Sequence, residues 1–492
     1  MMSISLGIIN KGIIMNSSLM TCSNVLHNNP ISFGTSGARG LVVDFTNELC
    51  AAFTHAFLDV VRKEFDFEKV ALAIDNRPSS YDIVKACAAA IRQHGYKVEF
   101  HGVIPTPALA YYAMHQNIPC IMVTGSHIPF DRNGLKFYRP DGEITKKDEI
   151  DILNSNYKFE VVNDFNDLPV NDEGAINYIK RYTSLFDSLV LSGLRIGIYE
   201  HSSAGRDLYA SIFGELGAEV IPLGRSDDFV PIDTEAVSNE DRQLAKKWSK
   251  EYNLDVIFST DGDGDRPLIS DEKGEWLRGD ILGLLASIAL GIEAVAVPVS
   301  CNTAIELSLN FKSIVRTKIG SPYVIEAFND LKNNYPSVAG FEANGGYLLA
   351  TDLIINEKQL LALPTRDAVL PAIMLLVAAQ GGKISKLVSL LPHRFTWSDR
   401  LKDFPTELTQ RLIASAIKSP DQFISDLGLE TRKCSSIDQT DGLRFVLDNG
   451  DVIHLRPSGN APELRCYTEA SEENQAKNYV EKILSKLVTL KS

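Results

Sequence analysis

The chain lacks cysteines close enough in sequence to form a metal-binding or disulfide motif. Its seven cysteines stand at least 28 residues apart, so neither a C-x-x-C metal pair nor a dense disulfide framework is present. The sequence also lacks any block rich in lysine and arginine, and its formal net charge is −14, which argues against a nucleic-acid or anionic membrane surface. The apolar segment 281–290 is well short of the ~18 residues of a membrane span. We therefore expect a cytoplasmic protein that binds neither nucleic acid nor membrane.

The length and composition of the chain predict several globular domains. At roughly 150 residues per domain, 492 residues correspond to about three or four domains. Hydrophobic residues make up 45% and charged residues 23%, which is typical of a soluble globular protein. The predicted limits are an N-terminal extension without fixed structure (1–30), three α/β domains (31–170, 171–277 and 278–390) and a C-terminal α+β domain (391–492).

Apolar strands alternate with helical segments three times along the chain. The first series is strand 70–74, helix 79–94 and strand 97–101, and similar series begin at strand 194–199 and strand 294–299. The third series includes an expected helix over 303–310. This alternation predicts α/β domains with mixed, largely parallel sheets. Beyond about residue 391 a hairpin around Asn449-Gly450 indicates an α+β domain, and we expect all four domains to surround a central cleft.

Ligands in open α/β sheets bind beyond the carboxyl ends of strands, and a polar loop follows the apolar strand 120–123. It reads Thr124-Gly125-Ser126-His127, and the hydroxyl of Ser126 is a candidate nucleophile. A serine needs a base or a strong local field to attack. Lys136, between Leu135 and Phe137, is expected to be desolvated, with a lowered pKa suited to that task. The alternative is a turn-forming serine beside a solvated lysine.

A second loop carries three carboxylates at alternate positions. Asp261, Asp263 and Asp265 alternate with glycines after an apolar strand, and such crowded carboxylates repel one another unless a cation such as Mg²⁺ neutralises them. A calcium loop is excluded because Arg266 stands where that loop needs a glycine. A haloacid-dehalogenase-like phosphatase, with Asp261 as its nucleophile, is a competing interpretation that leaves Ser126 unexplained.

Two further loops carry groups suited to a phosphorylated sugar. Glu342 and Asn344, in the loop 340–347, can hydrogen-bond vicinal hydroxyls, although a capped turn is the alternative. The loop 456–465 offers a guanidinium, a hydroxyl, an amide and backbone N–H groups, which are the elements of a phosphate cradle. There the alternative is a turn whose Arg456 forms a surface ion pair.

With these residues laid out, the chain resembles the α-D-phosphohexomutase family from about residue 31 to about residue 470. The segment 33–40 resembles the family's N-terminal motif, which implies that Arg39 supports the phosphate on the active serine. Ser126 matches the phosphoryl-carrying serine, His127 its neighbour and Lys136 the acid/base lysine. The remaining matches imply that Asp261, Asp263 and Asp265, together with Ser126, bind Mg²⁺. They further imply that the substrate is bound by Arg266, Glu342, Asn344, Arg456, Ser458, Gly459 and Asn460.

The resemblance implies an isomerase that moves phosphate between the 1- and 6-positions of a hexose. The expected route uses a phosphoserine enzyme, a hexose 1,6-bisphosphate intermediate and Mg²⁺, and a hinge near 388–400 that lets the bisphosphate turn. On family grounds the expected substrates are mannose 1- and 6-phosphate, with glucose or (acetyl)glucosamine phosphates as alternatives, and the expected state is a monomer or homodimer. Many members have histidine where Gly346 stands, so the second acid/base remains open.

Overall fold

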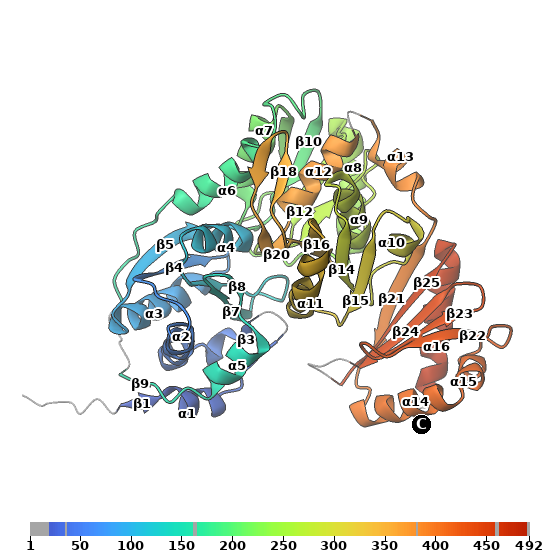
Figure 1. Cartoon of the computed structure of the whole chain (residues 1–492), viewed down its shortest axis with the longest axis horizontal. Helices are drawn as coiled ribbons and strands as arrows, with labels where there is room; N and C mark the ends of the chain where they lie inside the picture. The colour runs from blue at the N-terminus through green and yellow to red at the C-terminus, as the bar shows by residue number, and fades with distance from the viewer. Residues whose placement is uncertain (1–18, 35–36, 161–164, 380–381, 458–461, 490–492) are drawn as a thin grey trace, which may run out of the picture.

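The computed structural model describes residues 19–34, 37–160, 165–379, 382–457 and 462–489. Across these ranges, four sheets of four or more strands follow one another in an arc (Figure 1). We call them unit 1 (20–159), unit 2 (173–269), unit 3 (279–389) and unit 4 (395–489). No helix in the described part of the chain is both long and apolar enough to cross a bilayer.

Unit 1 is built on a seven-stranded mixed sheet. Its central strand β4 (Lys69–Ile74) pairs in parallel with β5 (Lys97–Val103) and β6 (Cys120–Val123), and is apolar and almost wholly buried because helices cover it. The remaining strands are β2 (Ser32–Phe33), β3 (Ala38–Leu41), β7 (Arg132–Arg139) and β8 (Gly142–Glu143). The helical segments are η1 (Val42–Asp44), α2 (Asn47–Val61), α3 (Ser80–Gln93), α4 (Thr106–His115) and α5 (Lys146–Leu153).

The expectation of an N-terminal extension without fixed structure is wrong for residues 20–27. Strand β1 (Met20–Thr21) pairs antiparallel with β9 (Lys158–Phe159), and α1 (Cys22–His27) packs against α2 and α5. Cys22 and Leu26 are buried in the core of unit 1, and burial of such apolar side chains stabilises this short helix. Residues 1–18 of the predicted extension lie outside the described residues.

Unit 2 holds a four-stranded sheet in the order β11-β10-β12-β13. Strand β10 (Arg195–Tyr199) lies parallel to β11 (Glu219–Leu223) and β12 (Val256–Thr260), and β13 (Pro267–Ile269) returns antiparallel to β12. The loop between β12 and β13 carries the three predicted aspartates, so a tight reversal holds them in place. The helices are α6 (Glu173–Thr183), α7 (Arg206–Glu215) and α8 (Asn239–Tyr252).

Unit 3 repeats this plan with a five-stranded sheet. Its strands are β15 (Ser313–Thr317), β14 (Ala294–Pro298), β16 (Val338–Phe341), β17 (Tyr347–Leu349) and β20 (Leu363–Asp367), and a separate hairpin joins β18 (Leu353–Ile355) to β19 (Lys358–Leu360). The helices are α9 (Gly279–Ala289), α10 (Ala304–Leu307), α11 (Ser321–Asn334), α12 (Val369–Ala379) and α13 (Ile384–Ser389). The helix expected over 303–310 is only α10, because Leu309 adopts a left-handed φ of 56°.

Unit 4 is an antiparallel sheet with its own core. Its strands run in the order β21 (Phe395–Leu401), β25 (Leu464–Ala470), β24 (Val452–Pro457), β23 (Leu443–Leu447) and β22 (Cys434–Asp438), with α14 (Thr406–Lys418), α15 (Pro420–Asp426) and α16 (Glu473–Thr489). Its buried apolar residues form a cluster separate from the large cluster that runs through units 1 to 3. The predicted fold class, three α/β units followed by an α+β unit, is confirmed.

Polar contacts join unit 4 to unit 3. Glu469 of β25 accepts hydrogen bonds from the backbone N–H of Thr303 (3.0 Å) and from Nε of Arg394 (2.6 Å). The Nδ2 group of Asn302 donates to the backbone carbonyl of Arg394 and to Oγ1 of Thr396, both at 3.0 Å. Hydrogen bonds rather than a shared apolar core therefore hold this junction.

Candidate active site

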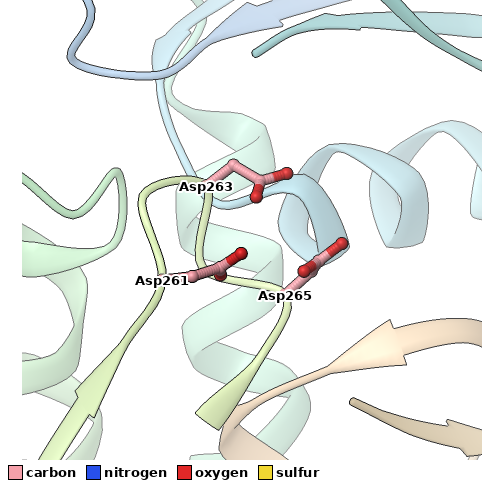
Figure 2. A group of neighbouring side chains, drawn as sticks. All are labelled: Asp261, Asp263 and Asp265. Atoms are coloured by element: carbon pink, nitrogen blue, oxygen red, sulfur yellow. The ribbon is translucent and has the colours of Figure 1, made fainter. Parts of the chain in front are cut away.

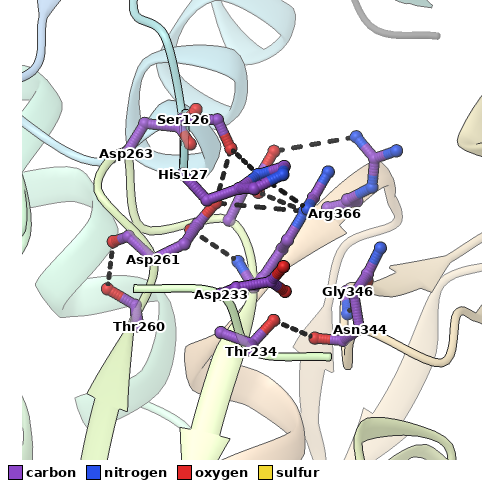
Figure 3. A network of polar contacts seen from close by, with 12 residues as sticks. Ser126, His127, Asp233, Thr234, Thr260, Asp261, Asp263, Asn344, Gly346 and Arg366 are labelled. Carbon is purple, nitrogen blue, oxygen red and sulfur yellow. Dashed lines mark hydrogen bonds and ion pairs between the residues drawn. The ribbon is translucent and has the colours of Figure 1, made fainter. Parts of the chain in front are cut away.

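The loops after β6 and β12 meet although they belong to different units. The hydroxyl Oγ of Ser126 donates to Oδ2 of Asp261 at 2.6 Å, and both residues are fully buried (Figure 3). Ser126 has a left-handed φ of 55°, which is an uncommon conformation for a residue with a side chain. The structure thus places the predicted nucleophile directly against the predicted metal-binding loop.

A buried ion pair that the sequence interpretation missed shapes the serine loop. Asp75 follows β4, and its Oδ2 accepts hydrogen bonds from Oγ1 of Thr124 (2.7 Å) and the N–H of Gly125 (3.3 Å). Burial raises the pKa of Asp75, and the charge of Arg77 opposes that rise. The available signal was the D-x-R triplet at the carboxyl end of β4, the same edge that carries Ser126.

Arg77 completes this support. Besides its pairing with Asp75 at 3.1 Å, its guanidinium donates to the backbone carbonyls of Ser126 (3.0 Å) and of three residues further along, Ile128, Pro129 and Arg132. A Cβ at Gly125 would lie 2.6 Å from Cζ of Arg77, so only glycine fits beneath the guanidinium. Arg77 therefore fixes the loop from Ser126 onward, while Asp75 holds the two residues before it.

The three aspartates converge as predicted. Their carboxylate oxygens lie within 4.8 Å of one another, and all three side chains are buried (Figure 2). Burial, reinforced by the charges of Asp263 and Asp265, raises the pKa of Asp261 to about 8. The Oδ1 atoms of Asp263 and Asp265 have no hydrogen-bond partner among the described residues. Buried, mutually repelling oxygens with free lone pairs fit a hard divalent cation such as Mg²⁺.

Glycine between the aspartates is required by the close approach of the serine loop. A Cβ at Gly262 would stand 2.6 Å from the backbone carbonyl of Ser126, and Gly264 has a φ of +73°. Thr106, the first residue of α4, donates through its hydroxyl to Asp263 and through its N–H to the Asp263 carbonyl (2.8 Å). Units 1 and 2 are thus joined at the aspartate loop itself.

Lys136 lies on β7 and contacts two of the three aspartates. Its Nζ donates to Oδ2 of Asp263 and to Oδ2 of Asp265, each at 2.6 Å, and the residue is 4% exposed. The sequence analysis expected desolvation to lower the pKa of Lys136, and the structure contradicts this. Burial does lower it, but the two carboxylates outweigh burial and the pKa is raised.

Cationic and neutral donors surround Ser126. Nη1 of Arg266 donates to Nδ1 of His127 at 3.0 Å; burial and the Arg266 charge lower the pKa of His127 to about 3, so the imidazole is neutral at pH 7. Burial lowers the pKa of Arg39 to about 10, which still leaves it charged. The Nε and Nη2 atoms of Arg39 are buried without a hydrogen-bond partner in the described ranges, an arrangement suited to an incoming anion.

The predicted sugar loop reaches the same region from unit 3. Asn344 accepts through its backbone carbonyl from Oγ1 of Thr234 (2.7 Å), which joins the loop to unit 2 (Figure 3). Glu342 pairs with the buried Arg366 at the end of β20, a residue that the sequence analysis did not select. A Cβ at Gly346 would lie 2.6 Å from Cδ of Arg366, so the arginine occupies the space that a side chain at position 346 would need.

The loop of unit 4 is the predicted part that the structure describes least. Ser458, Gly459 and Asn460 lie outside the described residues. Arg456 pairs through Nε with Oδ2 of Asp441 at 2.8 Å, and the same oxygen accepts from the backbone N–H of Ile319 (3.0 Å). The predicted phosphate-binding arginine is therefore oriented by an aspartate that also contacts unit 3.

Three α/β units bring together a buried serine hydroxyl, a converging carboxylate trio and several cationic side chains. This arrangement is suited to phosphoryl transfer and is consistent with metal binding. Four family models match the chain in order: Phosphoglucomutase/phosphomannomutase, alpha/beta/alpha domain I at 30–160, domain II at 176–274, domain III at 279–395 and the C-terminal domain at 410–486. The chain belongs to the phosphoglucomutase/phosphomannomutase family and is an isomerase of the phosphohexomutase type. The haloacid-dehalogenase interpretation is thereby set aside.

Curated relatives and solved structures agree. The chain is 57% identical over 464 residues to a phosphomannomutase of Salmonella muenchen, covering 94% of this chain and 97% of the relative. It is 40% identical to a phosphomannomutase of Sinorhizobium fredii over 91% and 96% of the two chains. A crystal structure of a putative phosphomannomutase from Thermus thermophilus matches with a TM-score of 0.73 at 21% identity, over 94% of this chain and 99% of that one.

An N-acetylphosphoglucosamine mutase of Aspergillus fumigatus, solved in complex with GlcNAc-6P and magnesium, shares the fold more distantly. Its TM-score is 0.57 at 13% identity, and the match covers 95% of this chain and 98% of that one.

Proposed function

We propose that this protein is a phosphomannomutase that interconverts mannose 1-phosphate and mannose 6-phosphate. The observation that carries the chemistry is the 2.6 Å contact between Ser126 Oγ and Asp261, inside the aspartate trio. The choice of sugar rests on the 57% identical phosphomannomutase of Salmonella muenchen. A phosphoglucosamine mutase of Nautilia profundicola is 33% identical over 62% of this chain, which favours mannose over glucosamine.

In this proposal Ser126 carries the phosphoryl group between the two positions of the hexose. Its Oγ holds the phosphate, which passes to the free hydroxyl of the hexose phosphate; the resulting hexose 1,6-bisphosphate turns in the site and returns its other phosphate to Ser126. Arg39, whose buried Nε and Nη2 have no hydrogen-bond partner among the residues that the structure describes, supports the phosphate on Ser126. Asp261, Asp263 and Asp265, together with the phosphorylated Ser126, would hold Mg²⁺, which supplies neutralisation of the phosphoryl oxygens during transfer.

Lys136 is proposed to handle the proton of the sugar hydroxyl. Its Nζ is charged because Asp263 and Asp265 raise its pKa. A cation held by Asp263 and Asp265 would take up part of their charge, which would favour release of the lysine proton. His127, neutral and already accepting from Arg266, is proposed to orient the serine loop rather than to transfer this proton.

Substrate binding is assigned to groups on units 2 to 4. Arg266, Glu342 and Asn344 are proposed to hold the sugar, and Arg456 with the loop residues 458–460 to hold its non-reacting phosphate. Because the bisphosphate must turn between transfers, unit 4 is proposed to move about residues 388–400, and its separate core allows this. Seven free cysteines support the further proposal of a cytoplasmic enzyme, which acts as a monomer or homodimer.

Two experiments test the proposed function. Turnover of mannose, glucose and glucosamine 1-phosphates, each primed with its 1,6-bisphosphate, is expected to give the highest kcat/KM for mannose; a preference for glucosamine would overturn the sugar assignment. Incubation with a ³²P-labelled hexose 1,6-bisphosphate, followed by peptide mapping, is expected to place the label on Ser126. The Ser126→Ala variant should lose the label and the control Ser226→Ala should keep it, whereas a label on Asp261 would refute the serine mechanism.

A further inference from the structure

A polar cavity lies away from the catalytic loops, where units 1, 2 and 3 meet. Its volume is about 470 Å³. It is lined by the end of α4, by one face of α6 and by the residues that lead from β19 into β20, and these elements lie side by side (Figure 1). A volume of this order suits a small metabolite. The proposed mutase reaction uses none of its lining residues.

The charge of this cavity is opposite to that of the whole protein. Its cationic or titratable side chains are His115, Lys180 and Arg181, and its other polar side chains are Tyr111, Gln116, Asn177, Ser184 and Gln359. No carboxylate lines it among the described residues, although the chain carries a formal net charge of −14. Such a basic recess on an acidic protein attracts anions.

Arg181 is the buried centre of this recess. It is 5% exposed, and its Nη2 donates to the backbone carbonyl of Leu361 at 2.9 Å. Its guanidinium carbon lies 4.6 Å from the ring centroid of Tyr111. Its Nε and Nη1 have no hydrogen-bond partner in the part of the chain that the structure describes. Burial lowers the pKa of Arg181, but Tyr182 and Asp367 outweigh burial and the pKa is raised, so the guanidinium stays cationic. A phosphate oxygen is a suitable acceptor for its two unpartnered N–H groups.

Two rigid elements connect this cavity with the catalytic loops. Helix α4 ends at His115 in the cavity and begins at Thr106, which binds Asp263; ten helical residues span about 15 Å. Strand β20 begins two residues after Leu361 of the cavity and carries Arg366, which pairs with Glu342. An occupant would therefore contact the elements that position both the aspartate trio and the sugar loop.

The geometry points to this cavity as a binding site for a small phosphorylated molecule, distinct from the catalytic site. Arg181 and Lys180 receive the phosphate, and the amides of Gln116, Asn177 and Gln359 hydrogen-bond the polar remainder. Because the site is formed by three units at once, an occupant stabilises their mutual arrangement. The ligand is either free phosphate or an organic phosphate, which share the same recognition chemistry.

Binding titrations with two probes test this inference. Inorganic phosphate and a nucleoside diphosphate are titrated calorimetrically into the wild-type protein, Lys180→Glu and the control Lys250→Glu, an exposed lysine of α8. Reversing a charge that lines the site should weaken binding there at least tenfold, whereas the control should bind as the wild type does. Arg456→Gln, altered at the catalytic cleft, should retain this class of site. Tighter binding of the diphosphate identifies an organic phosphate as the ligand, and equal binding identifies phosphate.

A second measurement locates the ion directly. Crystals soaked in tungstate, an anomalous scatterer that mimics phosphate, should show a peak within hydrogen-bond distance of Nε or Nη1 of Arg181. Absence of that peak, or a Lys180→Glu isotherm equal to that of the wild type, would overturn the inference. Neither outcome bears on labelling of Ser126, so the proposed mutase reaction stands or fails separately.

Discussion

Replacement of Arg77 by methionine offers the most direct test of how the serine loop is held. Methionine keeps much of the apolar volume but removes the partner of the buried Asp75 and the donor to four backbone carbonyls. Breaking a buried ion pair costs about 3–5 kcal/mol, because the remaining charge is left without compensation. We expect a loss of stability of this order, seen as a lower midpoint in urea unfolding.

Turnover should fall further than stability alone predicts. The guanidinium sets the position of the Ser126 carbonyl at 3.0 Å, and a displacement of about 1 Å at a reacting group costs about 10²-fold in rate. Measured under conditions where the variant is folded, kcat for Arg77→Met should be lower by about that factor. Arg92→Met, at an exposed position on α3, serves as the matched control.

A double substitution separates the charge from the loop geometry. Asp75→Asn combined with Arg77→Met leaves no buried charge, so it should recover part of the stability lost in Arg77→Met without recovering kcat. If Arg77→Met unfolds at the wild-type urea concentration and turns over within twofold of the wild type, the guanidinium does not position the loop and the reasoning is wrong.

Three further predictions follow from other parts of the structure. Removal of divalent cations by chelation should abolish turnover, and added Mg²⁺ should restore it. Turnover of Asp263→Asn should recover little at any Mg²⁺ concentration, and full activity of that variant in chelator would contradict the metal assignment. Gly346→Ala places a Cβ 2.6 Å from Cδ of Arg366, which should displace the arginine from Glu342 and raise KM at least tenfold in steady-state kinetics. An unchanged KM would show that the pair of Arg366 and Glu342 does not shape the sugar site. Burial lowers the pKa of His55 to about 4, below its unfolded value near 6.5, so the unfolded state binds more protons and the free energy of unfolding should fall as the pH drops from 6.5 to 4. In urea unfolding, His55→Gln should reduce this fall by up to about 3 kcal/mol; the same pH dependence in the variant and the wild type would refute the reasoning.

Sequence reasoning found the parallel strands well because each is a short apolar run followed by a polar loop. The strands β4, β6, β10 and β14 lie within about one residue of their predicted ends. It did not identify β7, because Arg132–Arg139 alternates charged and apolar residues beside a loop that was interpreted for its chemistry. It also missed α12, since Val369–Ala379 is apolar on every side and carries no helical period.

Site residues were predicted correctly where the residue type and its place after a strand are enough to indicate the role. Ser126 and the aspartates stand out because a hydroxyl and three crowded carboxylates follow apolar strands. Arg366 carries no such local signal, because its role depends on the pairing of β20 with β17, which sets distant segments side by side. The direction of the Lys136 pKa was missed for a related reason, since the two carboxylates that raise it come from another unit.

The junction between units 3 and 4 has a consequence for how the protein can diversify. Glu469, Thr303 and Arg394 meet through hydrogen bonds. Water could therefore replace each contact during the movement proposed for unit 4, with little apolar surface newly exposed. The same property makes that sheet interchangeable. A chimaera in which a relative supplies roughly the last hundred residues should fold. It would bind the substrate's non-reacting phosphate as the donor does, while the loop that carries Ser126 stays unchanged.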